Sequence, residues 1–469
     1  MEKLKFKQIM SLTLTLFAVF FGAGNMVFPP AMGQLAGENY WQALIGFILT
    51  DAGIALLGII AVVLVGNEIT DLGNLVSKKF SIFLSIVVYL LIGPLFALPR
   101  TGSVSYELAA KPYVPSEYSW LVSLAVTAVF FAVTYFLSAR PNKIVDIIGK
   151  YLTPILILSI VAIFFSCLFM DKSNHTVQYG ATTATDSYTQ GGAFFQGLIE
   201  GYNALDGPAG LVFAIIIINA VTGFGIKKRK NITKYTVICG IGAVIILSAI
   251  YFMLTYIGAS TLTSFPNGGE LLHAVTSDLL GTPGGIILGI AVLLACLTTS
   301  IGLTTSFSDY FHELIPSVSY QKIALIVCVF SFVISNVGLT QLVAVSLPVL
   351  MAVYPVLVVL IILSFFKRWI QHRRMIYVLS MAFAFCISFI NGLDSANIPL
   401  GIVADWVGML PLYDLNLGWM IPAAIGAVIG ILPFWPMNKK KTKERGYNQS
   451  ELLAKNICKN LNLKYLPLS

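Results

Sequence analysis

The sequence predicts an all-α membrane protein with about twelve transmembrane helices. Its residues are 57% hydrophobic and only 11% charged, whereas a soluble domain carries about 25% charged residues. The apolar residues gather in runs of the roughly 20 residues that a membrane-spanning helix needs. Two of these runs are interrupted by glycine and polar residues at matching positions, which favours a transporter built from two repeats.

Twelve apolar stretches are candidates for spanning helices. They cover residues 9–32, 41–65, 82–108, 119–138, 146–170, 192–224, 236–258, 285–308, 322–336, 341–366, 376–392 and 417–436. The stretch 399–411 is too short to span, so we interpret it as interfacial or re-entrant. In the tail, residues 449–466 combine helical apolar spacing with lysines, which predicts a short helix on the membrane surface.

Lysine and arginine residues predict the orientation of the chain. With both termini in the cytoplasm, all of them except Arg100, Lys111 and Lys172 fall in cytoplasmic segments. The formal net charge of +8 then reflects clusters that set topology and face anionic lipid. We therefore expect membrane lipid, and not nucleic acid, as the partner of these charges.

The chain divides into two antiparallel repeats and a trailing pair. We expect a first repeat over 1–180 and a second over 181–370, each with five spans, followed by accessory spans in 371–438 and a basic cytoplasmic tail in 439–469. An odd number of spans in each half gives the halves opposite orientations in the membrane.

The first interruption runs from Phe21 to Asn25. Gly22 and Gly24 lack side chains, so a ligand can approach their backbone closely. The half-helix that follows presents the positive end of its dipole, which suits a carboxylate. Gly22, Ala23, Gly24 and Asn25 are therefore candidate substrate-binding residues. The alternative is that the glycines only let two helices pack closely.

The second interruption falls in 196–208, where glycines, Pro208 and two acidic residues stand in apolar sequence. Ionisable residues at membrane depth usually mark a functional pathway, and unwound carbonyls suit an ammonium group. The candidate substrate-binding residues are Gln196, Glu200, Gly201, Tyr202 and Asn203. The alternative is an ordinary extracellular loop between two shorter helices.

A third candidate site lies on the predicted helix over 285–308. Ala295, Thr298, Thr299 and Gly302 share one helical face. Hydroxyl and carbonyl oxygens on this face, opposite the carbonyls of a broken helix, form the kind of all-oxygen site that suits a hard cation such as sodium. The alternative is that these hydroxyls bond only to their own helix or to a neighbour.

Arg100 lies in a run that Pro94 and Pro99 are expected to kink. It is a candidate gate together with Asp206, because it has Asp51, Glu200 or Asp206 within its expected reach. A structural ion pair near the outer mouth is the alternative.

The sequence contains no phosphate-binding loop, no zinc-ligand spacing and no nucleophile motif, so we expect no enzyme activity and no prosthetic group.

Three stretches resemble the bacterial branched-chain amino acid:cation symporters of the BrnQ type. They are Phe21–Pro30, Gly93–Thr101 and Glu200–Asp206. The first also resembles the broken first helix of the amino acid–polyamine–organocation group, and Ala295–Ile301 resembles the eighth helix of LeuT-type sodium symporters.

The resemblance implies a LeuT-like five-plus-five inverted repeat with helices 1 and 6 broken, in a bacterial plasma membrane. It implies uptake of leucine, isoleucine and valine by sodium symport, and it leaves the oligomeric state open. By the same resemblance, sodium would bind the carbonyls of Ala18, Phe21 and Ala295 and the hydroxyls of Thr298 and Thr299. The substrate carboxylate would meet the amides of Ala23 and Gly24.

Several alternatives stay open. Some related carriers use protons and a lysine of the fifth helix, for which Lys150 is the available residue. A carrier for another small amino acid or a polyamine, and a channel or sensory protein, are the other possibilities.

Overall fold

The computed structural model describes residues 3–139, 153–169, 175–189, 191–370 and 373–432. Over these ranges the chain is helical between its loops, and its isolated β-bridge joins Tyr179 to Thr261. The predicted tail helix over 449–466 and Lys150 lie outside the described residues.

The first half of the chain forms five groups of helices. In order they are α1 (Phe6–Phe20) and α2 (Ala23–Ala36); α3 (Tyr40–Ile48), a π-helical segment (Leu49–Gly53) and α4 (Ile54–Val65); α6 (Lys78–Leu90), a second π-helical segment (Leu91–Leu95) and α7 (Ala97–Ala109); α8 (Ser119–Ser138); and α10 (Thr153–Phe169). The short α5 (Ile69–Gly73) connects α4 to α6.

The second half repeats this pattern. Its helices are α11 (Gly192–Ala204) and α12 (Asp206–Gly223); α13 (Arg229–Ala259); α14 (Gly268–Leu314); α15 (Tyr320–Ser335); and α16 (Leu339–Phe365). A kink at Gly281, where φ is +67°, divides α14 into an outer segment and a long helix. The long helix covers the predicted span 285–308, and the outer segment extends it toward the N-terminus.

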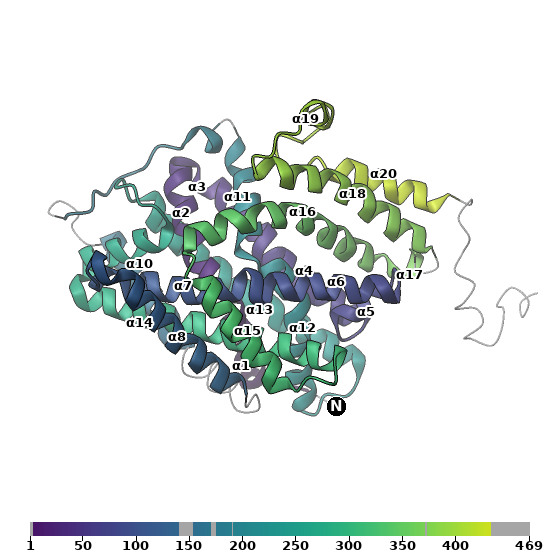
Figure 1. Ribbon diagram of the computed structural model, residues 1–469, viewed down its shortest axis with the longest axis horizontal. Coiled ribbons are helices and arrows are strands. Elements are labelled where there is room, and N and C mark those ends of the chain that lie inside the picture. The colour runs from purple at the N-terminus through teal and green to yellow at the C-terminus, as the bar shows by residue number, and fades with distance from the viewer. Residues whose placement is uncertain (1–2, 140–152, 170–174, 190, 371–372, 433–469) are drawn as a thin grey trace, which may run out of the picture.

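Up to residue 432, where the described part of the chain ends, four further helices follow: α17 (Lys367–Ile370), α18 (Arg374–Ser395), α19 (Ile402–Gly408) and α20 (Met420–Ile431). In Figure 1, α16, α18 and α20 lie side by side along one flank of the molecule. α19 lies within the stretch that the sequence marks as too short to span.

Among the described residues, eight helical segments are both long enough and apolar enough to cross a membrane. Four further apolar helices are shorter. Within the described residues, each of the twelve predicted stretches overlaps one of the helices or a pair of half-helices. The predicted kink in the third stretch is confirmed: Gly93 has non-helical dihedral angles directly before Pro94. The all-α polytopic fold is therefore as predicted.

The contacts between the two halves are reciprocal. The α1–α2 pair packs on α13, and the α3–α4 pair packs on α11 and α12. The next groups also meet their counterparts, since α7 contacts α14 and α8 contacts α15. A pseudo-two-fold axis that exchanges each span with the fifth one after it produces this pattern of contacts.

Glycines let the backbones of α11 and α3 approach closely. A side chain on Gly197 would collide with the Ala43 carbonyl oxygen, and one on Gly46 would collide with the Phe194 carbonyl oxygen. Gly201 faces the Thr50 hydroxyl in the same way. These residues form the small-residue interface on which helix association in membranes depends.

We expect Gly197→Ala to lower the free energy of unfolding by about 1–3 kcal/mol, because the added methyl group overpacks this interface. Thermal unfolding of the purified protein in detergent measures the effect. Gly223→Ala is the matched control, since a methyl group there meets no atom within 4 Å. Equal melting temperatures for the two variants would contradict this account of the interface.

Candidate functional site

The first interruption lies between α1, which ends at Phe20, and α2, which begins at Ala23. Gly22 is extended, with φ −117° and ψ −156°. A Cβ atom at Gly22 would lie 2.8 Å from Thr299 Oγ1, so only glycine lets α14 approach the connection this closely. Within the connection, the Gly22 amide donates to Asn25 Oδ1 at 3.4 Å.

The second interruption is a single residue, Leu205, which lies toward the C-terminal end of the predicted stretch 196–208. The helix α11 continues through 196–203, and Leu205 then adopts a left-handed conformation with φ +75° before α12 starts at Asp206. The glycines at 197 and 201 do not unwind α11 because they serve its contact with α3. A leucine holds this strained conformation because its buried side chain packs among Leu91, Phe96 and Leu350.

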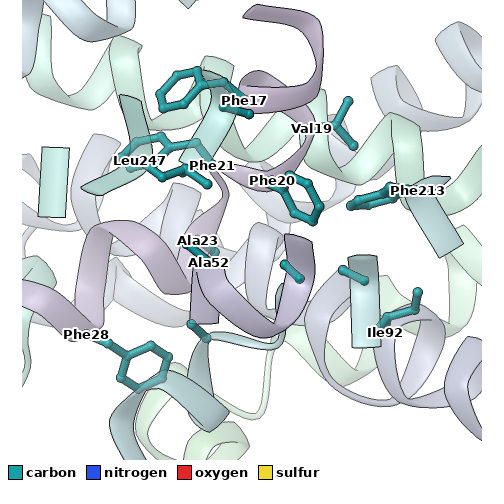
Figure 2. Packing of buried hydrophobic residues seen from close by; sticks show 14 of the residues in the cluster. Phe17, Val19, Phe20, Phe21, Ala23, Phe28, Ala52, Ile92, Phe213 and Leu247 are labelled. Atoms are coloured by element: carbon teal, nitrogen blue, oxygen red, sulfur yellow. The ribbon is translucent and has the colours of Figure 1, made fainter. Parts of the chain in front are cut away.

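A small cavity lies between the two interruptions. It is lined by the α1–α2 connection, by Ala204, Leu205 and Asp206, and by residues of α7, α12 and α14. Its volume is about 30 Å³, which is room for about two water molecules. Figure 2 shows Phe20 turned toward Phe213 beside the first interruption, and their rings meet edge to face at 5.6 Å.

Both apolar and polar groups line this cavity. Its apolar wall is formed by Val19, Phe20, Ile92, Phe213 and Leu303. Its polar lining comes from the first turns of α2 and α12 and from Arg100, Thr101 and Thr299.

Oxygen atoms converge where α1 ends against α14. The Thr298 hydroxyl lies 3.0 Å from the Ala18 carbonyl and 2.7 Å from the Ala295 carbonyl. One residue further along each helix, the Thr299 hydroxyl donates to the Val19 carbonyl at 3.1 Å. The Ala18 and Val19 carbonyls are available because α1 stops before a following turn can use them. Four of the five predicted sodium ligands therefore lie at this junction, and Phe21 follows directly at the C-cap of α1.

The N-termini of two half-helices face the cavity. Ala23 and Gly24 begin α2, and Asp206 begins α12. The Asp206 carboxylate already supplies a negative charge at the end of α12, and it accepts a hydrogen bond from Asn25 Nδ2 at 2.7 Å. The first turn of α2, unlike that of α12, contains no acidic side chain. Its backbone amides therefore remain available to an anionic ligand at this cavity.

A buried hydrogen-bond network extends from Asn25 and Asp206. Asn25 Nδ2 also donates to the Tyr251 hydroxyl, which in turn donates to Asp51 Oδ2 at 2.5 Å. The residues Asp51 and Tyr251 are fully buried. Neither was among the predicted site residues, although an aspartate inside the apolar run 41–65 was a visible signal.

Arg100 is buried against neutral groups. Its Nη1 donates to the Asn203 carbonyl at 2.6 Å and its Nη2 to Ser346 Oγ at 3.1 Å, and its guanidinium lies 5.2 Å from the Phe28 ring centre. None of the ion pairs between described residues includes Arg100. None of its three candidate partners, Asp51, Glu200 and Asp206, is among these contacts, and Glu200 instead accepts from Asn203 Nδ2 at 3.3 Å.

The predicted residues of 196–203 lie beside the cavity and not in its described lining. Gln196 and Glu200 are half-buried on α11, and Gly201 contacts the Thr50 hydroxyl. The Tyr202 ring lies 4.2 Å from that of Tyr354. Asn203 acts through its carbonyl on Arg100. The residues that take their place in the lining are Ala204, Leu205 and Asp206.

Two solved structures share this fold. The crystal structure of MhsT in complex with L-phenylalanine aligns with a TM-score of 0.53 at 15% identity, over 89% of this chain and 97% of its own. The nucleobase-cation-symport-1 family transporter Mhp1 aligns with a TM-score of 0.60 at 13% identity, over 94% and 96%. They confirm the LeuT-like architecture that the sequence predicts.

Sequence relatives extend over nearly the whole chain. The Branched-chain amino acid permease BraB of Bacillus subtilis is 41% identical over 92% of this chain and 96% of its own. BrnQ of the same organism is 40% identical over 92% and 98%, and BrnQ of Escherichia coli is 33% identical over 92% and 96%. The family model for branched-chain amino acid transport proteins matches residues 5–436. The chain therefore belongs to the family of branched-chain amino acid transport proteins, which are carriers and not enzymes.

Proposed function

We propose that this protein imports leucine, isoleucine and valine across the bacterial plasma membrane by symport with sodium. The observation that carries the proposal is the convergence of the Ala18 and Ala295 carbonyls with the Thr298 hydroxyl beside the cavity. An ion at this junction touches both α1 and α14, so its binding stabilises the arrangement that closes around a substrate.

The substrate class is supported by the relatives and by the cavity. The relatives are branched-chain amino acid permeases, and the apolar wall of Val19, Ile92 and Leu303 suits an aliphatic side chain. The amides of Ala23 and Gly24 suit the carboxylate, and Asp206 suits the ammonium group. Because the cavity is small, we propose that Phe20 and Phe213 separate when the substrate enters.

A polyamine is a poorer fit than a zwitterion. The buried guanidinium of Arg100 lines the same cavity as Asp206, so a ligand with only positive charges meets repulsion on one side. An amino acid carries one charge of each sign and meets a complementary group for each.

The coupling ion is proposed to be sodium because the converging groups are neutral oxygen atoms. Hard cations prefer oxygen ligands, and a set without carboxylates keeps the binding weak enough for release. Coupling to protons is the alternative.

Both termini are proposed to be cytoplasmic, in line with the basic residues of the loops.

Uptake of labelled leucine into proteoliposomes tests the function. We expect an inward sodium gradient to concentrate leucine inside the vesicles, and a proton gradient without sodium to give no accumulation. Equilibration of leucine without concentration under either gradient would indicate a channel and contradict the proposal.

We expect Thr298→Val with Thr299→Val to raise the sodium concentration for half-maximal uptake at least about tenfold, or ~1.4 kcal/mol of binding free energy. The substitutions remove two ligand oxygens while conserving volume. Thr304→Val is the matched control on the same helix, since its hydroxyl contacts Cys328 Sγ at 3.9 Å and not α1. An unchanged sodium dependence in the well-expressed double variant would rule out this site.

We expect leucine to displace a bound competitor far better than its decarboxylated amine does, because the amine lacks the group that the α2 amides bind.

Gly24→Leu should abolish leucine binding, since even a Cβ atom at this position lies 3.1 Å from the Ala204 backbone. Binding is measured with the purified protein. Equal competition by leucine and the amine would place the carboxylate elsewhere.

A further inference from the structure

Two carboxyl groups from distant parts of the chain meet at one hydroxyl group. Tyr251 on α13 donates to Asp51 Oδ2 at 2.5 Å, and its oxygen lies 3.5 Å from Asp206 Oδ2. Asn25 fixes the other side of this arrangement, since its amide donates to both Asp206 and Tyr251. All four side chains are at most 4% exposed. We refer to Asp51 and Asp206 below as the aspartate pair.

No basic side chain balances the aspartate pair among the described residues. The elements that pack against the segment Leu49–Gly53 are α3, α4, α11, α12 and α13. Their titratable groups near the pair are acidic or phenolic: Glu200 and Tyr202 on α11, Asp206 on α12 and Tyr251 on α13. Tyr354 of α16 adds a phenol, which donates to the Thr50 carbonyl.

The basic residues of these elements lie far from the pair. Lys234 is the last of those at the start of α13, and the 17 residues to Tyr251 span about 25 Å of helix. Arg100 directs its Nη atoms at Asn203 and Ser346. Two ionised carboxylates here would thus form a buried double negative charge without a directly paired counter-ion, which the low dielectric of the site disfavours.

Asp51 has an oxygen that is ready for a proton. Its Oδ1 atom is buried and has no hydrogen-bond partner. Asp51 also lies in a π-helical segment that interrupts the span between α3 and α4, and such segments occur frequently at functional sites. Asp206 differs, because the N-terminus of α12 and the Asn25 amide both favour its ionised form.

We propose that the aspartate pair is a proton-binding site that holds one proton, carried by Asp51. A proton from water forms an O–H bond on the Asp51 carboxyl group, Asp206 stays ionised, and the charge of the pair changes from −2 to −1. No further reactant is needed. This proposal rests on the proposed function in one respect only, namely that an amino acid occupies the adjacent cavity.

The pair is connected to that cavity on one side. Asp206 and Asn25 line it, whereas Asp51 and Tyr251 are not part of its described lining. A substrate ammonium group beside Asp206 therefore acts on the proton of Asp51 across the aspartate pair. This arrangement gives substrate binding a dependence on pH that is separate from the oxygen cluster at Thr298.

Infrared difference spectroscopy of the purified, detergent-solubilised protein tests the proposal without any need for transport. We expect a C=O stretching band of a protonated carboxyl group at neutral pH, which alkaline titration removes with a single-proton profile. Asp51→Asn should abolish this band. Glu107→Gln is the control, because that carboxylate lies 3.9 Å from the Lys111 ammonium and its loss should leave the band in place.

If Asp51→Asn does not fold, Tyr251→Phe provides a second test, because it keeps both carboxyl groups and removes the hydroxyl between them. We expect the band to shift in frequency in this variant. A wild-type protein without the band, a band that neither Asp51→Asn nor Tyr251→Phe alters, or a band that sodium removes at constant pH would each overturn the proton site.

Leucine uptake by the same preparations separates this proposal from the proposed function. A band that responds as expected in a protein without sodium-driven uptake would support the proton site and overturn the transport proposal. Uptake in a protein without the band would overturn the proton site alone.

Discussion

The structure depends on one constraint: backbone polar groups that leave a helix inside the membrane must find partners within the protein. Each of the two interruptions frees such groups, and side chains from other helices satisfy them. Thr298 and Thr299 donate to carbonyls at the end of α1, and Arg100 donates to the Asn203 carbonyl near the end of α11. The centre of the molecule is therefore held together by bonds that cross from one repeat to the other.

The same constraint distributes charge around the cavity. Arg100 binds neutral acceptors, while Asp206 takes its hydrogen bond from the neutral amide of Asn25. Arg100 and Asp206 do not form an ion pair with each other, so both can still attract the charged groups of a ligand in the cavity. A buried direct ion pair would instead leave little attraction for a zwitterion. The price of this arrangement is desolvation of both groups, which the surrounding hydrogen bonds offset.

Much of the fold could be predicted from the sequence, because length and apolar composition constrain a spanning helix strongly. The first interruption was also predictable, since two glycines beside Asn25 in an apolar run indicate a point where another group approaches the backbone closely. The second was predicted over 196–208, a stretch that contains the break but is much broader than it. Its glycines at 197 and 201 reflect contact with α3, and the actual change of direction occurs at Leu205. Only tertiary packing holds a leucine at positive φ, and no local pattern encodes that packing.

The aspartate pair was missed for a similar reason. Asp51 and Tyr251 are 200 residues apart in sequence, and neither forms a motif with its neighbours. Charge alone suggested that Arg100 meets Asp51, Glu200 or Asp206, but the fold directs Arg100 at the Asn203 carbonyl of α11 instead. The sequence thus predicted the helices that form the site reliably, but it predicted the contacts between their side chains less well.

The long separation of these partners has a consequence for how the protein is made. Asn25 meets Asp206 after 181 residues, and at a synthesis rate of about 5–20 residues per second this takes roughly 10–40 s. During that interval the first spans are already in the membrane, with Asn25 and Asp51 lacking their final partners. The emerging chain must therefore shelter polar side chains in the bilayer, or beside the insertion machinery, until the second repeat arrives.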